Sequence, residues 1–103
     1  MQKFRLETTI AGSRFISGCA AALSRLNKGD EVRVIRDHHN RHDDKAVAVY
    51  GGIFHIGYVP RAVNGPLADL LDGGGSVRAT VSVDPIIYGD SIKSPPKILI
   101  EED

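Results

Sequence analysis

The sequence predicts a mainly β domain, built as a small barrel of five to six strands with two short helices. Apolar and polar residues alternate over several short segments, as in strands that bury one face. Glycine and proline turns separate these segments, and only two short stretches carry apolar residues at helical spacing. Many short strands of this kind are typical of a closed sheet, and an open α+β sheet is the alternative.

The strand predictions depend on alternation and on turn residues. Gly51-Gly52 predicts a tight hairpin, because two-residue turns favour residues that accept a positive φ. Pro60 ends the strand before it, since proline cannot donate to a strand ladder. The last strand is expected at an edge of the sheet. The predicted strands are residues 3–10, 31–36, 46–50, 53–59, 76–83 and 97–101.

Two helices are predicted. Phe15, Cys19, Leu23 and Leu26 recur at helical spacing and predict a short helix over residues 17–26. A second helix is expected over 66–71, since a proline suits its first turn. Residues 84–96 hold two turn signals, and the acidic residues that follow the last strand are expected to be disordered.

Composition narrows the possible functions. Thirteen Lys and Arg balance thirteen Asp and Glu, so the chain has no strong overall field for nucleic acid or membrane. Four acids lie in the last fourteen residues, which leaves the preceding part mildly basic. Any binding of a polyanion should therefore be local and sensitive to salt.

Cellular context follows from what the sequence lacks. Cys19 is the only cysteine, so neither a disulfide framework nor a thiolate metal site is expected. We find no signal peptide and no run of about 18 apolar residues that a membrane span needs. We therefore expect one domain over residues 1–103, monomeric, without cofactor, in the cytoplasm and not in a membrane.

Residues 36–45 form an unbroken polar stretch between two apolar strand segments, and we interpret it as one long loop. Its His and Asp side chains could bind a metal, but their spacing matches no known metal motif. Asn40 or one of the aspartates could instead bond nearby backbone amides in an Asx-turn. We expect no enzyme activity, and a metal-dependent nuclease fragment is an alternative. The candidate ligands are His38, His39, His42, Asp43 and Asp44.

Aromatic residues stand beside arginines in the expected loops. Arg14-Phe15 follows the first strand, and Tyr58 and Arg61 flank the end of the hairpin. Arg36 and Arg41 flank and enter the polar stretch. Flat rings for bases and guanidinium groups for phosphates are what single-stranded nucleic acid binding requires. Core packing remains the alternative for Phe15, and a half-buried strand position for Tyr58.

Five segments together form a more specific pattern. They are Ala11-Gly12-Ser13-Arg14-Phe15, the stretch VRVIRD at 32–37, NRHDDKAVAV at 40–49, IGYVPR at 56–61 and LADLL at 67–71. Over residues 5–83 the chain resembles the HIRAN domain, a module of SWI2/SNF2-class DNA-repair helicases that also occurs alone in bacteria. The turn-rich residues 84–103 lie outside the resemblance.

The resemblance implies an OB-like barrel that captures the 3′ end of single-stranded DNA in a small pocket. Arg14 and Phe15 match the arginine on phosphate and the ring stacked on a base. Asp43 matches the aspartate that accepts a hydrogen bond from the terminal 3′-hydroxyl. Tyr58 and Arg61 match positions that line the terminal nucleotide and its phosphates.

His42 is a departure from the family pattern, because it stands where the family generally has a stacking tyrosine. Imidazole offers a smaller face and can carry charge, so we expect weaker stacking that strengthens as the pH falls towards about 6. The implied function is capture of DNA 3′ ends in repair or replication-fork processing, with a helicase or nuclease partner left open. A protein-interaction module without DNA binding is a further alternative, because a net charge of zero is low for a DNA binder.

Overall fold

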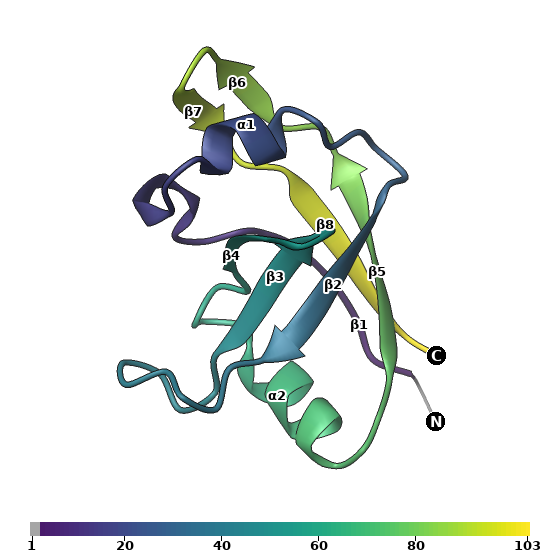
Figure 1. Cartoon of the computed structure of the whole chain (residues 1–103). Helices are drawn as coiled ribbons and strands as arrows, with labels where there is room; N and C mark the ends of the chain where they lie inside the picture. Colours follow the sequence, from purple (N-terminus) through teal and green to yellow (C-terminus); the bar gives the residue numbers. More distant parts are fainter. Residues whose placement is uncertain (1–2) are drawn as a thin grey trace.

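A computed structural model of the chain describes residues 3–103. Eight strands, two α-helices and one 3-10 helix make up this part of the chain (Figure 1). In chain order they are β1 Arg5–Thr9, the 3-10 helix η1 Ser13–Phe15, α1 Cys19–Leu23, β2 Glu31–Arg36, β3 Val47–Gly51, β4 Phe54–Tyr58, α2 Gly65–Asp72, β5 Val77–Val83, β6 Ile86–Tyr88, β7 Ser91–Ser94 and β8 Lys97–Glu102.

Six of the strands form one antiparallel sheet in the order β1-β8-β5-β2-β3-β4. The sheet curls strongly, so its two outer strands approach one another (Figure 1). Ala11, just after β1, pairs with Tyr58 at the end of β4, and each N–H donates to the other's carbonyl over 2.8 Å. This single bridge closes the curl, which confirms the predicted mainly β barrel.

Apolar side chains from all six strands of the sheet fill the inside of the curl. The alternation of β8 places Ile98 and Ile100 there, both fully buried. Leu23 of α1 and Leu67 of α2 are also fully buried, and the two helices cover opposite ends of the barrel (Figure 1). Each such side chain contributes about 1.5–3 kcal/mol through the apolar surface that it removes from water.

The last strand is not at an edge of the sheet, and this expectation was wrong. β8 pairs with β1 on one side and with β5 on the other. The acidic end is ordered, because its carboxylates have partners: Glu102 accepts the Phe4 N–H over 2.8 Å, and Asp103 accepts the Ser76 hydroxyl over 2.8 Å. Charge near the terminus suggested an exposed tail, whereas the alternating isoleucines determined the strand.

Two further differences concern short elements. Residues 86–94 form the hairpin β6–β7, which turns at Gly89 (φ 58°). Only its turn was predicted, because its strands are too short to show alternation. The first helix begins later than expected, at Cys19, after Gly18 takes a left-handed conformation (φ 75°). Neither helix of residues 3–103 has the length and apolarity needed to cross a membrane.

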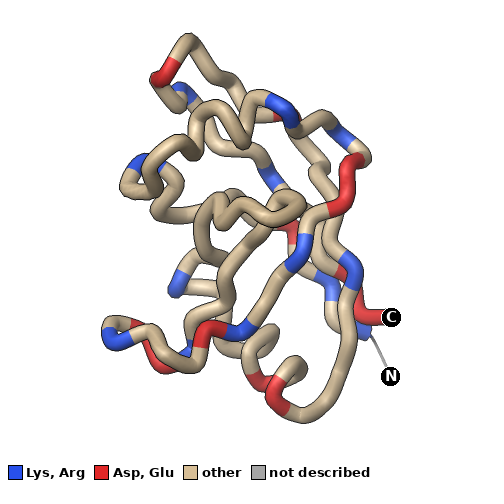
Figure 2. The backbone as a smooth tube through the Cα atoms, viewed as in Figure 1, with Lys and Arg blue, Asp and Glu red and all other residues tan. Residues whose placement is uncertain are grey.

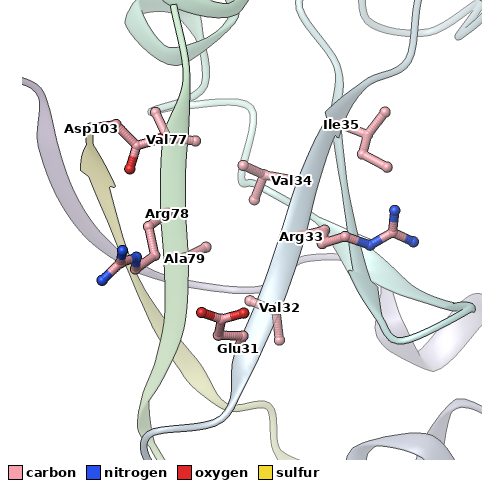
Figure 3. Close-up of a pocket in the computed structure, with 9 residues that line it drawn as sticks. All are labelled: Glu31, Val32, Arg33, Val34, Ile35, Val77, Arg78, Ala79 and Asp103. Carbon is pink, nitrogen blue, oxygen red and sulfur yellow. The ribbon is translucent and has the colours of Figure 1, made fainter.

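The barrel is open between β2 and β5. Pairing between them covers only Glu31 with Thr80 and Val32 with Ala79. Beyond these pairs the strands separate and leave a cleft of about 410 Å³ (Figure 3). None of the six residues predicted to bind nucleic acid lines this cleft.

Candidate nucleic-acid interface

Tyr58 connects the loops that carry the predicted residues. Its backbone pairs with Ala11, and its ring lies beside Gly12. Its hydroxyl donates to Asp37 Oδ2 over 3.1 Å, at the start of the polar loop 37–45. Burial, and then the bond to Asp37, raises the pKa of Tyr58, so the hydroxyl stays protonated near neutral pH. Figure 1 shows the loops after β1, β2 and β4 on the same side of the molecule.

A bulge in β4 sets the direction of the Tyr58 side chain. The register shifts so that Ile56 has no partner of its own on β3, while the residues on either side of it are paired. Ile56 points into the core and is fully buried. Because the bulge inserts one residue into the alternation, His55 and Tyr58 project to the same outer face although they are three positions apart.

Gly57 allows the loop after β1 to pass close to this bulge. Its φ of 152° lies in the region that favours glycine, and a Cβ there would clash with the Ile10 side chain and the Ala11 carbonyl oxygen. The Ile56 carbonyl, displaced by the bulge, accepts the hydroxyl of buried Ser13 over 2.6 Å. The loop that carries Arg14 is therefore fixed directly to β4.

The polar loop is held by its own side chains. Asn40 Oδ1 accepts the N–H of His42 over 2.9 Å and that of Asp43 over 3.1 Å. Asp43 Oδ1 accepts the N–H of Lys45 over 2.9 Å. These Asx-type contacts confirm the interpretation that Asn40 and an aspartate organise the loop.

The Asp43 carboxylate has a fixed orientation. Its second oxygen accepts the side-chain amide of Asn64 over 2.8 Å, and Asn64 is 2% exposed just before α2. No ion pair described for residues 3–103 involves Asp43. Each carboxylate oxygen can accept more than one hydrogen bond, so this half-buried group can still accept a neutral donor.

Arg36 supports the base of the loop and is not free for phosphate. Its guanidinium donates to the Ala46 carbonyl over 2.7 Å and to the Asp44 carbonyl over 3.0 Å. It also binds both carboxylate oxygens of Asp72, over 2.9 and 3.3 Å. These hydrogen bonds lower the pKa of Asp72, and the Arg36 side chain is only 10% exposed.

Arg14 and Phe15 occupy the short helix η1, which follows Gly12 in a left-handed conformation. Phe15 is 93% exposed, so it does not belong to the apolar face of the first helix. Arg14 donates to the carbonyl of Ile92 over 2.9 Å and, more weakly, to that of Lys93 over 3.4 Å. Its guanidinium is therefore directed towards β7, with other N–H groups left over.

His42 and Arg61 are exposed. Among the interactions described for residues 3–103, none involves either side chain. Arg61 lies in a tight turn, where the Val63 N–H donates to the Pro60 carbonyl over 3.0 Å. Both side chains are thus accessible to a ligand, and no carboxylate pairs with His42 in the described part.

The six predicted residues lie on three neighbouring loops, but they do not share one cleft. Arg14 lines a hollow of about 370 Å³ beside β7, which includes none of the other five. The arrangement is an open surface with an exposed ring, an exposed arginine and a fixed carboxylate, where the resemblance implies a small pocket. The six are Arg14, Phe15, His42, Asp43, Tyr58 and Arg61.

The metal-site alternative gains nothing from the geometry. No group of three His, Cys, Asp or Glu side chains within residues 3–103 is arranged to hold a metal ion. Basic and acidic residues are interspersed along the backbone of the described residues (Figure 2).

Sequence reasoning missed the residues that position Asp43 and Tyr58. Asn64 lies just before the predicted second helix, and nothing in the local sequence signals that it is buried. Asp37 was grouped with the other polar loop residues. The one available signal was the spacing Asn40-x-x-Asp43, typical of a side chain that bonds a backbone N–H three residues on.

Comparison with known proteins identifies the family. The model of the HIRAN domain matches residues 3–88. The fold is similar to the crystal structure of the HIRAN domain of human HLTF, with a TM-score of 0.70 and 20% identity over 95% of this chain and 74% of that chain. It is also similar to the crystal structure of a protein from Lactobacillus plantarum, with a TM-score of 0.75 and 25% identity over 99% of this chain and 100% of that chain. No curated protein matches. The chain therefore belongs to the HIRAN domain family, a family of nucleic-acid-binding modules with an OB-like fold.

Proposed function

We propose that this chain is a non-catalytic module that captures the 3′-hydroxyl end of single-stranded DNA. The observation that carries the proposal is the Asp43 carboxylate. It is held by the Lys45 N–H and the buried Asn64 amide, forms no ion pair described for residues 3–103, and lies in the same loop system as exposed aromatic side chains.

The chemistry of Asp43 favours a chain end over a chain interior. A carboxylate repels the phosphates of a DNA strand, so it is tolerated at a DNA site only where the ligand offers it a hydrogen-bond donor. A terminal 3′-hydroxyl is such a donor. A 3′-phosphate at the same position would place two anions together and would be rejected.

The other residues supply contacts that do not depend on base identity. Phe15 and His42 offer exposed rings for stacking, and Arg61 offers an unengaged guanidinium for a phosphate. Arg14 retains N–H groups beyond those bonded to the β7 carbonyls. Tyr58 contributes through the position of its ring between the two loops.

The proposal includes the setting in which such a module acts. A single monomeric domain that holds a free 3′ end would serve DNA repair or the processing of replication forks. A helicase or nuclease that acts on the captured end would be a suitable partner for such a module.

The first prediction tests end selectivity. A short oligonucleotide that ends in a 3′-hydroxyl should bind at least about tenfold tighter than the same strand with a 3′-phosphate. Losing the hydrogen bond while the carboxylate stays desolvated costs roughly 1–3 kcal/mol, and a like charge costs more. Fluorescence anisotropy with the two oligonucleotides measures the difference.

Two variants of Asp43 serve as controls for this prediction. Asp43→Ala should weaken binding of the 3′-hydroxyl strand, and Asp43→Asn, which removes the charge but keeps the size, should admit the 3′-phosphate. In both variants the affinities for the 3′-hydroxyl strand and the 3′-phosphate strand should be closer to each other than in the wild-type protein. Equal affinity of the wild-type protein for both strands would rule out end capture.

A further inference from the structure

Four side chains form a continuous row on the outer face of β2, β3 and β4. Arg33 lies opposite Tyr50, with its Cζ 5.7 Å from the ring centroid. Tyr50 lies opposite His55, with ring centroids 5.2 Å apart and planes 32° apart. His55 lies 4.8 Å from Tyr58, edge to face at 89°. The row therefore begins at Tyr58 in the candidate interface and leads away from it across the sheet.

Strand alternation places this row outside the barrel. Figure 3 shows Arg33 and Ile35 on the side of β2 opposite to Val34. On β3, Val49 is fully buried in the core and Tyr50 is only partly buried. On β4 the bulge returns Tyr58 to the face of His55, as described above. Arg33, Tyr50 and His55 are thus cross-strand neighbours, and the bulge adds Tyr58 to the same face.

The groups of the row are only partly engaged with the protein. One Nη of Arg33 donates to the Gly52 carbonyl over 3.0 Å, which leaves other N–H groups of the guanidinium. His55 Nε2 lies 2.9 Å from the Gly57 carbonyl. Among residues 3–103 no hydrogen bond to the Tyr50 hydroxyl is described, and the rings of Tyr50 and His55 are partly exposed.

Next to the row, Ile35 pairs with Ala48, and Ala48 pairs with Tyr58. Ala48 is only 5% exposed, so the larger side chains around it cover this part of the face. Ile35 is 41% exposed. Glu31, two residues before Arg33 on β2, is exposed, and its carboxylate would repel a phosphate. Tyr50 and His55 are themselves partly exposed, and the charge of Glu31 limits the row at Arg33.

We propose that the nucleotides upstream of the captured 3′ end run along this row. Bases stack on Tyr50 and His55, and a backbone phosphate binds Arg33. The inference rests on the proposed function, because Tyr58 joins the row to the site of the end. Aromatic faces beside a guanidinium bind any base and any phosphate, so the row adds affinity without sequence preference.

Oligonucleotide length separates this role from sheet packing, which cross-strand rings also serve. We would compare a dinucleotide and a hexanucleotide, both with a 3′-hydroxyl, by anisotropy at low salt. The dinucleotide fills only the end site, whereas a hexanucleotide is within the range of about 4–16 nucleotides that an OB fold covers. The wild-type protein should bind the hexanucleotide at least about tenfold tighter.

The variants follow from the geometry. Tyr50→Thr removes the ring and keeps a residue suited to a strand, and Arg33→Gln removes the charge. Each variant should bind the hexanucleotide no more than about threefold tighter than the dinucleotide. Its affinity for the dinucleotide should equal that of the wild-type protein. Arg78→Gln makes the same charge change on β5, outside the row, and should keep the wild-type preference for the hexanucleotide.

A wild-type experiment keeps the test valid even if a variant fails to fold, which thermal unfolding would reveal. A hexanucleotide with abasic sites at the third and fourth positions from the 3′ end should bind the wild-type protein only slightly tighter than the dinucleotide does. If the dinucleotide binds as tightly as the hexanucleotide, or if the abasic strand binds as tightly as the intact one, the row does not bind nucleotides. Neither result would contradict end capture. Binding of neither oligonucleotide would overturn both proposals.

Discussion

Tyr58 shows how one side chain can determine the geometry of the interface without being its chemical centre. Its backbone closes the barrel, its ring lies beside the loop of Phe15, and its hydroxyl anchors the polar loop through Asp37. From the sequence, Tyr58 could be recognised as an aromatic residue close to a basic one, Arg61. The structure adds that its hydroxyl has an internal acceptor.

Removing that hydroxyl is the second prediction. Tyr58→Phe should lower the free energy of unfolding by about 0.5–1.5 kcal/mol, because Asp37 loses a donor in a partly buried setting. Urea denaturation measures the loss. Tyr50→Phe is the matched control, since no hydrogen bond of its hydroxyl is described, and it should change stability little. Equal losses in both variants would mean that the bond to Asp37 contributes nothing.

The six predicted residues illustrate how far residue-level prediction reaches. The motif identified Asp43, and the structure shows the amide of Asn64 that orients it. Arg36 was suggested as a phosphate contact, but it is bound to Asp72. Which of several arginines is already paired depends on residues 36 positions away in the chain. No local pattern reports such a contact.

Among the elements, the bulge in β4 has the largest consequences, since it aims Tyr58 outward and lets the first loop approach. The third prediction is that Gly57→Ala destabilises the protein by about 3 kcal/mol or more. It combines an unfavourable φ of 152° with a clash against backbone and core. Gly52→Ala, at φ 59° with no neighbour within 4 Å, should cost only about 1–2 kcal/mol. Urea unfolding of both variants would test this, and similar losses would contradict it.

Arg36 and Asp72 join β2 to α2, and their pair gives the fourth prediction. The pKa of Asp72 is lowered in the folded state, so its contribution to stability is present above the pKa of the unfolded chain, about 4. That contribution is lost as the pH falls through the lower folded value. Asp72→Asn should therefore melt below the wild type at pH 7, and the difference in melting temperature should shrink as the pH falls below about 4. A difference in melting temperature that stays constant over this range would exclude the carboxylate as its cause.

For the whole molecule, the alternation of apolar and polar residues predicts where the strands lie in the sequence, but not which strands pair in the sheet. Every long strand was identified, since each buries alternate residues against the core. The place of β8 between β1 and β5 brings residues 98 positions apart into contact, as Phe4 and Glu102 are. Only the packing of the whole curled sheet decides such contacts. The separation of β2 from β5 also depends on this long-range packing, and no local sequence pattern predicts it.

The balance of charge over the whole molecule leads to the last prediction, the dependence of binding on salt. Arg36 is occupied by Asp72 and part of Arg14 by the β7 carbonyls, so few basic groups remain for phosphates near the candidate site. We expect about two to four phosphate contacts, which for a single strand gives a slope of log K against log salt of about −1.4 to −2.8. Arg61→Gln should make this slope shallower by about 0.7, while Arg78→Gln on β5 should leave it unchanged. Anisotropy titrations from low to physiological salt provide the slope. A value steeper than about −5 would require a wider basic surface than this balanced charge distribution provides, and would place binding outside the three loops.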